Sequence, residues 1–229
     1  MSQPANQSMS QPRSRSRASS GPRRALVTGA STGIGEATVR LLRSHGWDVI
    51  ATARRVERLR ALAADTGCAW IAADLQRADD VEALAAEALG AGGVDAVVNN
   101  AGGALGADPV ADGSPQEWLT MYERNVLAAL RVTQALLPGM RERGGDVVFL
   151  TSTAAHDTYP GGAGYVAAKH GERIIANTLR LELVGEPVRI IEIAPGMVAT
   201  SEFSLNRFHG DRSRADAVYA GVEAPLSAE

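Results

Sequence analysis

The fold is decided by residues 26–35, which read LVTGASTGIG. The stretch opens with an apolar pair, typical of a short buried strand, and ends where a helical pattern begins at Ile34. Between them lie Gly29 and Gly33, and glycine permits positive φ and a close approach of the backbone to a ligand. The amino end of a helix offers free N–H groups and partial positive charge to a phosphate. The stretch therefore predicts a strand, a glycine turn and a helix that together hold a nucleotide phosphate.

Downstream of this stretch, short apolar runs alternate with longer helical patterns. Further strands are expected at residues 48–53, 69–73, 95–98, 146–150 and 188–193, and helices at 56–64, 79–89, 115–137 and 163–184, with Pro138-Gly139 interrupting the longest one. Near-continuous apolar strands separated by helices indicate a parallel sheet that is covered on both faces. We therefore predict an α/β fold, a doubly wound and mostly parallel sheet in a single Rossmann-like domain. Ligands of such sheets bind beyond the carboxyl ends of the strands.

Composition and charge narrow the class of protein. The 229 residues suffice for one domain, and 45% of them are apolar, so a sizeable core can be buried. The net charge of −3 gives no reason to expect a nucleic acid as partner. No apolar run approaches the ~20 residues that span a bilayer, so no membrane is expected either. Cys68 is the single cysteine, which excludes an internal disulfide and favours a cytoplasmic location.

The first residues differ in composition from the rest. Residues 1–24 are rich in Ser, Gln, Pro and Arg, with five arginines and no acid. This segment has almost no large apolar side chain and cannot bury enough surface to order itself. We therefore expect a disordered tail over residues 1–24 and one domain over residues 25–229. An organelle transit peptide is the alternative, although the segment has no amphipathic face.

A tyrosine and a lysine stand four residues apart, as Tyr165 and Lys169. Residues at this spacing share one face of a helix. A cation held there favours the ionised phenolate and lowers the pKa of the tyrosine from about 10. Such a tyrosine can act as general acid or base on an alcohol or a carbonyl. Alone, the spacing is equally typical of a surface pair, but Ser152 lies thirteen residues upstream and the glycine loop opens the domain.

Several motifs resemble those of the short-chain dehydrogenase/reductase family. They are Thr-Gly-x-x-x-Gly-x-Gly at residues 28–35, Asn-Asn-Ala-Gly at 99–102, Pro-Gly at 195–196, and a tetrad of Asn125, Ser152, Tyr165 and Lys169 in the family's order. The resemblance runs from about residue 24 to the end of the chain. It implies an NADP-dependent oxidoreductase that interconverts an alcohol and a carbonyl by hydride transfer.

The resemblance also implies a role for each member of the tetrad. Tyr165 would exchange a proton with the substrate oxygen, and Ser152 would hold that oxygen in place. Lys169 would bind the ribose hydroxyls of the cofactor and lower the tyrosine pKa, while Asn125 would hold a water that links Lys169 to solvent. By residue chemistry alone, Ser152 could equally cap a strand end and Asn125 could bond a helix backbone.

The cofactor implied by the resemblance is NADP(H). An acid after the second strand would suit NAD, whereas an arginine suits the 2′-phosphate of NADP, and this sequence has Arg54-Arg55. Instead of binding the cofactor, this arginine pair could simply be the solvated start of a helix. In the same way, Asp74 could be an ordinary helix N-cap. The expected cofactor site comprises Gly29, Ser31, Thr32, Gly33, Ile34, Gly35, Arg54, Arg55, Asp74, Leu75, Asn99, Ala101, Gly102, Tyr165, Lys169, Pro195, Gly196, Val198 and Thr200.

Residues 197–222 are expected to form a substrate lid. They resemble the NADP-dependent 3-hydroxy acid dehydrogenase subgroup, which acts on serine, allo-threonine and related short hydroxy acids. Arg207 could pair with a substrate carboxylate or form a salt bridge between lid and body. His156 could line the substrate pocket beside Ser152 and Tyr165. No His, Cys and acid cluster has the spacing of a metal site.

The family usually continues for another helix and strand beyond the point where this sequence stops, so we expect those elements to be lacking. Ser227 followed by acid looks like the start of such a helix. The resemblance further implies a homodimer or homotetramer, paired through the helices near residues 116–136 and 163–183. The alternatives to an active enzyme are a catalytically silent NADP-binding regulatory or interaction protein and a truncated, inactive fragment.

Overall fold

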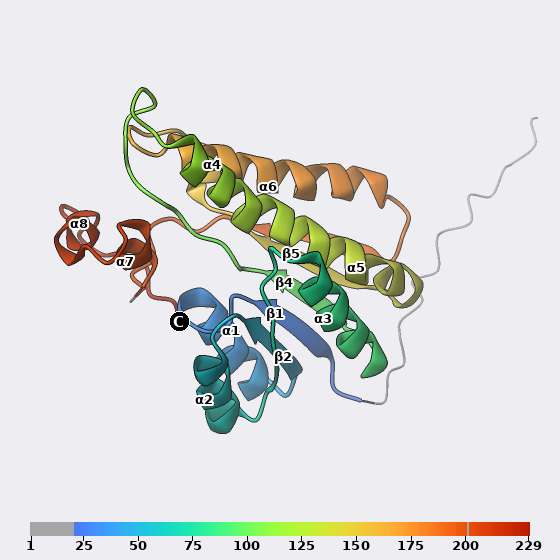
Figure 1. Ribbon diagram of the computed structural model, residues 1–229. Coiled ribbons are helices and arrows are strands. Elements are labelled where there is room, and N and C mark those ends of the chain that lie inside the picture. The colour runs from blue at the N-terminus through green and yellow to red at the C-terminus, as the bar shows by residue number, and fades with distance from the viewer. Residues whose placement is uncertain (1–20, 201) are drawn as a thin grey trace, which may run out of the picture.

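A computed structural model describes residues 21–200 and 202–229 (Figure 1). Most of the expected tail lies outside the described residues. The first strand begins at Arg24, whose backbone N–H donates to Asp95 Oδ2 at 2.8 Å. The Arg23 guanidinium lies over the Trp47 ring, 4.2 Å from its centroid. The last residues of the expected tail are therefore anchored to the domain.

A parallel sheet of six strands forms the centre of the described molecule, with the order β3-β2-β1-β4-β5-β6. The strands are β1 (Arg24–Thr28), β2 (Asp48–Ala53), β3 (Ala69–Ala72), β4 (Ala96–Asn99), β5 (Gly145–Leu150) and β6 (Val188–Ile193). The strand order reverses between β1 and β4, and this switch point is where such sheets bind ligands. The predicted Rossmann-like fold is confirmed.

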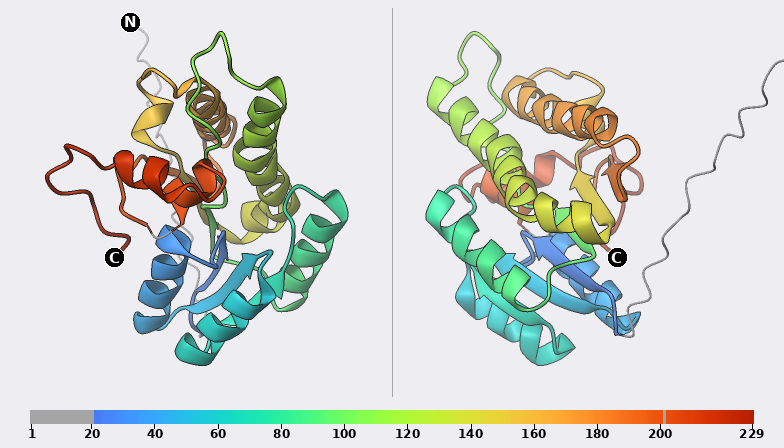
Figure 2. Two further views of the ribbon diagram at one scale, coloured as in Figure 1. Left: turned by 60° about the vertical axis from the view of Figure 1, so that its left-hand side comes forward. Right: turned by 90° about the vertical axis from the view of Figure 1, so that its right-hand side faces the viewer.

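Helices cover both faces of the sheet (Figures 1 and 2). Helices α1 (Gly33–Ser44) and α2 (Val56–Thr66) lie on one face, and α3 (Ala78–Gly90), α5 (Ala128–Arg143) and α6 (Ala163–Glu182) lie on the other. Helix α4 (Pro115–Tyr122) precedes α5, and the short helices α7 (Phe203–Arg207) and α8 (Arg212–Ala217) project beside the sheet. This layering gives two apolar clusters, one against each face of the sheet.

The long helical region after Pro115 differs from its prediction in two ways. A π-helical turn, η1 (Glu123–Leu127), joins α4 to α5, and such turns occur often at functional sites. Pro138 does not interrupt the helix but lies inside α5. Leu136 and Met140, on either side of Pro138, are each 1% exposed, so their burial in the core holds the helix through the proline.

The face of the sheet beside α1 is less completely covered over β4 to β6. A cavity of about 390 Å³ lies there, lined largely by apolar residues of these strands and of α1. Ile191 and Ile193 of β6 are 36% and 49% exposed. Near the end of the chain, Leu226 forms an isolated parallel bridge with Val198, where a helix start was expected. No helix among the described residues is long and apolar enough to cross a membrane.

Candidate active site

A cavity of about 1230 Å³ lies beyond the carboxyl ends of the strands. The glycine loop after β1, the loops after β2, β3, β4 and β5, helix α6 and the segment that carries α7 all contribute to its wall. Segments that are far apart in sequence meet here because all six strands run in the same direction. The cavity therefore stands where a doubly wound sheet places its ligand site.

The glycine loop approaches its neighbours so closely that side chains would not fit. Gly29 and Gly33 have φ values of 64° and 56°, which an L side chain rarely adopts. A Cβ on Gly35 would collide with the Gly29 carbonyl oxygen, so Gly35 serves helix packing and does not line the cavity. Thr32, the N-cap of α1, makes no side-chain capping bond. The amino end of α1 thus offers its N–H groups to the cavity.

Of the two asparagines at the end of β4, the one that lines the cavity is not the one that was predicted. Asn99 is 2% exposed and donates to Thr133 Oγ1 at 3.0 Å, away from the cavity. Asn100 lines the cavity wall, and its side chain donates to the Thr28 carbonyl at 2.7 Å. Successive side chains of a strand point to opposite faces of the sheet, so only one of the two neighbouring asparagines can point toward the cavity. Asn100, with Ala101 and Gly102, is the part of this motif that lines the cavity.

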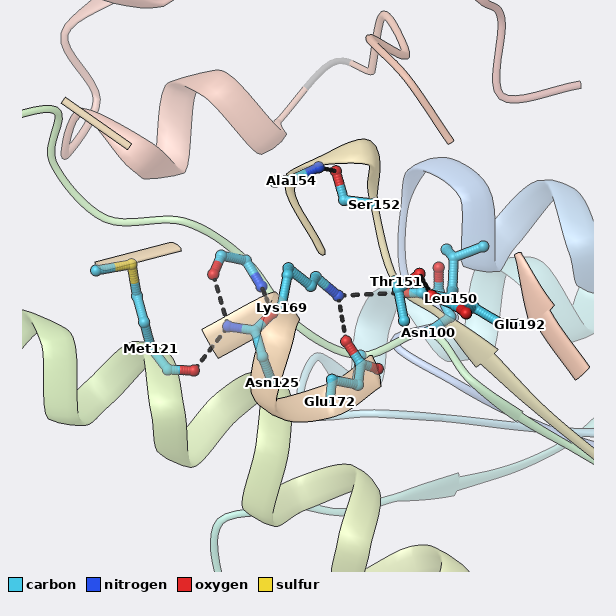
Figure 3. Close-up of polar contacts among 12 residues, drawn as sticks. Asn100, Met121, Asn125, Leu150, Thr151, Ser152, Ala154, Lys169, Glu172 and Glu192 are labelled. Carbon is cyan, nitrogen blue, oxygen red and sulfur yellow. Dashed lines mark hydrogen bonds and ion pairs between the residues drawn. The ribbon is translucent and has the colours of Figure 1, made fainter. Parts of the chain in front are cut away.

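Tyr165, Ser152 and Lys169 come together in the cavity. Ser152 follows β5, and its hydroxyl accepts from the Ala154 N–H at 3.2 Å and lies close enough to Tyr165 to lower the pKa of its phenol. The Lys169 ammonium lies 5.9 Å from the centroid of the Tyr165 ring. It donates to the Leu150 carbonyl at 2.9 Å and to Glu172 Oε2 at 2.7 Å (Figure 3). The arrangement places a proton-carrying phenol, a hydroxyl and a buried cation around one point of the cavity.

The predicted lowering of the Tyr165 pKa is wrong in its net effect. Loss of solvation raises the pKa above the ordinary value of 10.0, and this outweighs the lowering by Lys169 and by the hydrogen bond with Ser152. Glu172 adds to the rise, because its negative charge opposes the phenolate. The phenol is therefore protonated at neutral pH.

Asn125 holds the loop after β4 and does not line the cavity. Its amide donates to the carbonyls of Gly103 and Met121 at 2.9 and 2.7 Å, and its Oδ1 accepts from the Gly103 N–H at 3.1 Å (Figure 3). The side chain is 0% exposed. The alternative of a bond to the helix backbone thus describes this side chain, and its expected link to a water stays a prediction.

The two arginines after β2 have separate surroundings. Both are exposed and line the cavity, but Arg55 donates to Ser31 and pairs with Glu202 Oε2 at 2.7 Å, whereas Arg54 makes no hydrogen bond or ion pair to the described residues. Arg124 of η1 also lines the wall, and burial together with the nearby charge of Arg54 lowers the pKa of its guanidinium. Two positive charges therefore face this end of the cavity beside Asp74.

The segment after β6, which was expected to form a lid, lines one part of the cavity wall. Thr200 packs against Gly33, and its buried Oγ1 makes no hydrogen bond to the described residues. Arg207 of α7 is 8% exposed and donates to the carbonyls of Gly106 and Gly161 at 2.7 and 3.2 Å. Both carbonyls belong to the body, so Arg207 links lid and body without the expected salt bridge. Within the described residues, no carboxylate pairs with it.

The cavity wall differs from the predicted substrate site at one residue. His156 is exposed and pairs with Glu192 at 3.3 Å outside the cavity. Several wall or neighbouring residues were missed, namely Asn100, Arg124, Glu172 and Glu202. Of these, Glu172 had a signal in the sequence, because it stands three residues after Lys169 on the same helix. Across the described residues, no group of three or more His, Cys, Asp or Glu could hold a metal ion.

Comparison with known proteins identifies the family. A sequence model of the short chain dehydrogenases matches residues 23–208. The chain belongs to the short-chain dehydrogenase family. It is therefore an oxidoreductase by family, as the motifs of the glycine loop and the tetrad predicted.

The relatives of this family member include enzymes with named substrates. An uncharacterized oxidoreductase of Mycobacterium tuberculosis is 54% identical over 90% of this chain and 80% of the relative. A serine 3-dehydrogenase of Agrobacterium fabrum is 44% identical over 89% of this chain and 82% of the relative. The solved closed form of a serine dehydrogenase complexed with NADP+ is 38% identical, with a TM-score of 0.84 over 90% of this chain and 84% of that structure. The expected likeness to hydroxy acid dehydrogenases is confirmed.

Proposed function

We propose that this short-chain dehydrogenase is an NADP-dependent oxidoreductase that interconverts a small hydroxy acid and its carbonyl form. The observation that carries the proposal is that Tyr165, Ser152 and Lys169 share one cavity with the glycine loop. Reduction of a carbonyl needs a bound hydride donor and a proton donor, and the glycine loop offers a site for the first while the phenol is the second. The named activities of the relatives support the same reaction class.

The residues of the cavity fit a dinucleotide. The positive φ of Gly29 and Gly33 and the uncapped amino end of α1 form a cradle that side chains would fill. The buried Thr200 Oγ1, unpaired among the described residues, and the Asn100–Gly102 loop face the same space. When bound, NADP(H) supplies or accepts the hydride.

The residues beside the cofactor handle the proton. In the direction of reduction, the protonated Tyr165 donates its proton to the substrate oxygen, and in oxidation its phenolate accepts the proton. Ser152 donates a hydrogen bond to the same oxygen and fixes its position. The Lys169 ammonium favours the phenolate, and its contact with the Leu150 carbonyl holds it at the end of β5. Because the Tyr165 pKa is raised, the phenol holds the proton that reduction needs at neutral pH, and the rate of oxidation, which needs the phenolate, should rise with pH.

The 2′-phosphate of NADP would lie at the arginine end of the cavity. Arg54 is exposed there, and Arg124 adds a second guanidinium. The positive charge of Arg54 is close enough to lower the Arg124 pKa, so an anion between them relieves their repulsion. Arg55 is already bound to Ser31 and Glu202, which makes Arg54 the more available partner.

The lid supplies a cation for an acidic substrate. Arg207 lines the cavity, and its partners among the described residues are neutral carbonyls and aromatic rings, so its charge is not neutralised. Its Nη1 group makes no hydrogen bond to the described residues. A carboxylate fits this fork of donors. A hydroxy acid would thus present its carboxylate to Arg207 and its hydroxyl to Tyr165.

The proposal includes a cytoplasmic homo-oligomer. Exposed apolar side chains follow the outer face of α4 and α6, where pairing was expected. Leu119 is 63% exposed, Ile174 59% and Leu181 76%. An apolar face of this kind favours a second copy as its cover.

Sedimentation velocity is expected to show a dimer or tetramer, and a monomer at micromolar concentration would refute this part of the proposal.

Removing the Tyr165 hydroxyl tests the enzyme assignment. Tyr165→Phe should lower the rate of NADPH consumption with a panel of carbonyl acids by about 10²-fold or more, because the proton donor is lost. Binding of NADPH, measured as a thermal shift, should persist. NADPH binding without turnover in the wild type would favour a regulatory protein, and the absence of any thermal shift would favour an inactive fragment.

A charge reversal tests the cofactor preference. Arg54→Asp should weaken NADPH binding about tenfold or more and leave NADH binding nearly unchanged, because only NADPH carries the 2′-phosphate. Arg60→Asp is the matched control, since Arg60 lies on α2 and pairs with Glu57. Equal losses for NADPH and NADH in Arg54→Asp would refute the assignment of Arg54.

A pair of substrates tests the role of Arg207. Arg207→Leu should lower kcat/KM for a hydroxy acid by about tenfold or more relative to kcat/KM for its neutral amide, because only the acid carries the carboxylate. Arg207→Lys keeps the charge and should retain much of the preference for the acid. If Arg207→Leu lowers both kcat/KM values by the same factor, Arg207 serves only to hold the lid.

A further inference from the structure

A buried carboxylate lies against the catalytic lysine. Glu172 stands one helical turn after Lys169 on α6, and its Oε2 accepts from the Lys169 Nζ at 2.7 Å. Glu172 is 0% exposed and Lys169 4% exposed, so water does not screen this ion pair. Figure 3 shows the two side chains pointing toward one another, with the Leu150 carbonyl as the other acceptor of the ammonium. The pair is therefore part of the site and not a surface ion pair.

A purely structural role does not account for the Glu172 carboxylate. Its second oxygen, Oε1, is buried and makes no hydrogen bond to the described residues. A buried carboxylate with one partner costs more free energy than an apolar side chain of similar size in the same place. Hence the fold itself gains little from Glu172, whereas the position of the Lys169 charge depends on it.

The negative charge of Glu172 acts on Tyr165 through the same geometry. Lys169 lowers the pKa of the phenol and Glu172 raises it, so the carboxylate offsets part of the ammonium's effect. Other groups face the cluster from neighbouring elements. Burial raises the pKa of Glu172, the Lys169 ammonium opposes this rise, and the charge of Glu192 of β6 adds to it. Tyr159, before α6, adds to the rise in the pKa of Tyr165.

The charge of Glu192 is itself shared with groups outside the pair. It pairs with Arg173 of α6 at 3.9 Å and with His156, after β5, at 3.3 Å. Its side chain also accepts from the Thr151 hydroxyl at 2.9 Å. Glu172 is therefore the carboxylate that contacts the Lys169 ammonium, and Glu192 acts only from a distance.

We propose that Glu172 is a positioning residue for the reaction: it holds the Lys169 ammonium at the end of β5 and offsets its charge beside Tyr165. This inference rests on the proposed function, because it assigns Tyr165 and Lys169 their roles in proton transfer. It adds a fifth side chain to the predicted tetrad. Its consequence is that the pH range in which Tyr165 takes up a proton is set by Glu172 as well as by Lys169.

The variant Glu172→Gln tests this role, because glutamine keeps an acceptor for Lys169 and removes the charge. We expect the ionisation of Tyr165 to move to lower pH by about one pH unit. Tyrosinate absorbance measures it without any substrate, as the titration of each protein minus that of the same protein carrying Tyr165→Phe. The pH profile of kcat/KM for alcohol oxidation should move in the same direction by a similar amount.

Two further variants separate charge from structure. Glu182→Gln makes the same change of charge at the exposed end of α6 and should leave both pH profiles unchanged. Glu172→Asp keeps the charge but draws it back, so it should lower the midpoint by much less than Glu172→Gln does and should lower kcat. It also serves as the test if Glu172→Gln does not fold, which thermal unfolding would show.

Each outcome decides the proposal. An unchanged Tyr165 midpoint in folded Glu172→Gln, or a midpoint lowered by Glu172→Asp as far as by Glu172→Gln, would overturn the assigned role. A wild type that turns over no carbonyl substrate would refute the proposed function, while the tyrosinate titration would still decide whether Glu172 controls Tyr165. The two failures are thus distinguishable.

Discussion

The burial of one positive charge, that of Lys169, links the candidate active site to the fold. An ammonium with 4% exposure must find partners within the protein, because an unpaired buried charge costs several kcal/mol. Lys169 finds them in the last carbonyl of β5 and in Glu172 of its own helix. These contacts fix α6 against the end of β5. Since Ser152 follows β5 and Tyr165 precedes Lys169 by one turn, they also bring the serine and the tyrosine together.

The parallel sheet places the cavity beside these residues. Because all strands run the same way, the ends of β1, β4 and β5 lie along one edge, and each is followed by a loop that faces the cavity. The glycine loop brings N–H groups, the loop after β4 brings Asn100, and the loop after β5 brings Ser152. In the proposed function, the phosphate site and the proton-transfer site are thus assembled from segments that are far apart in sequence. The segment after β6 adds the charge of Arg207 to the same cavity.

Sequence reasoning predicted those features that depend on local pattern. Every strand and the glycine loop follow from short apolar runs and from glycine spacing, and the structure confirms each of them. Pro138 was predicted wrongly because the burial of Leu136 and Met140 outweighs the preference of a proline for helix ends. Contacts between distant segments decide which of Asn99 and Asn100 lines the cavity. They also decide that His156 contacts Glu192. The Tyr165 pKa was misjudged for a similar reason, since desolvation and the Glu172 charge are set by packing.

The account makes one central claim, that the glycine loop and the Tyr165–Lys169 pair serve a single bound NADP(H). The most direct test is a crystal structure of the protein with NADP+. The account predicts phosphates at the amino end of α1 and the nicotinamide end of the molecule beside Tyr165 and Lys169. A nucleotide bound elsewhere, or one whose nicotinamide end points away from Tyr165, would contradict it.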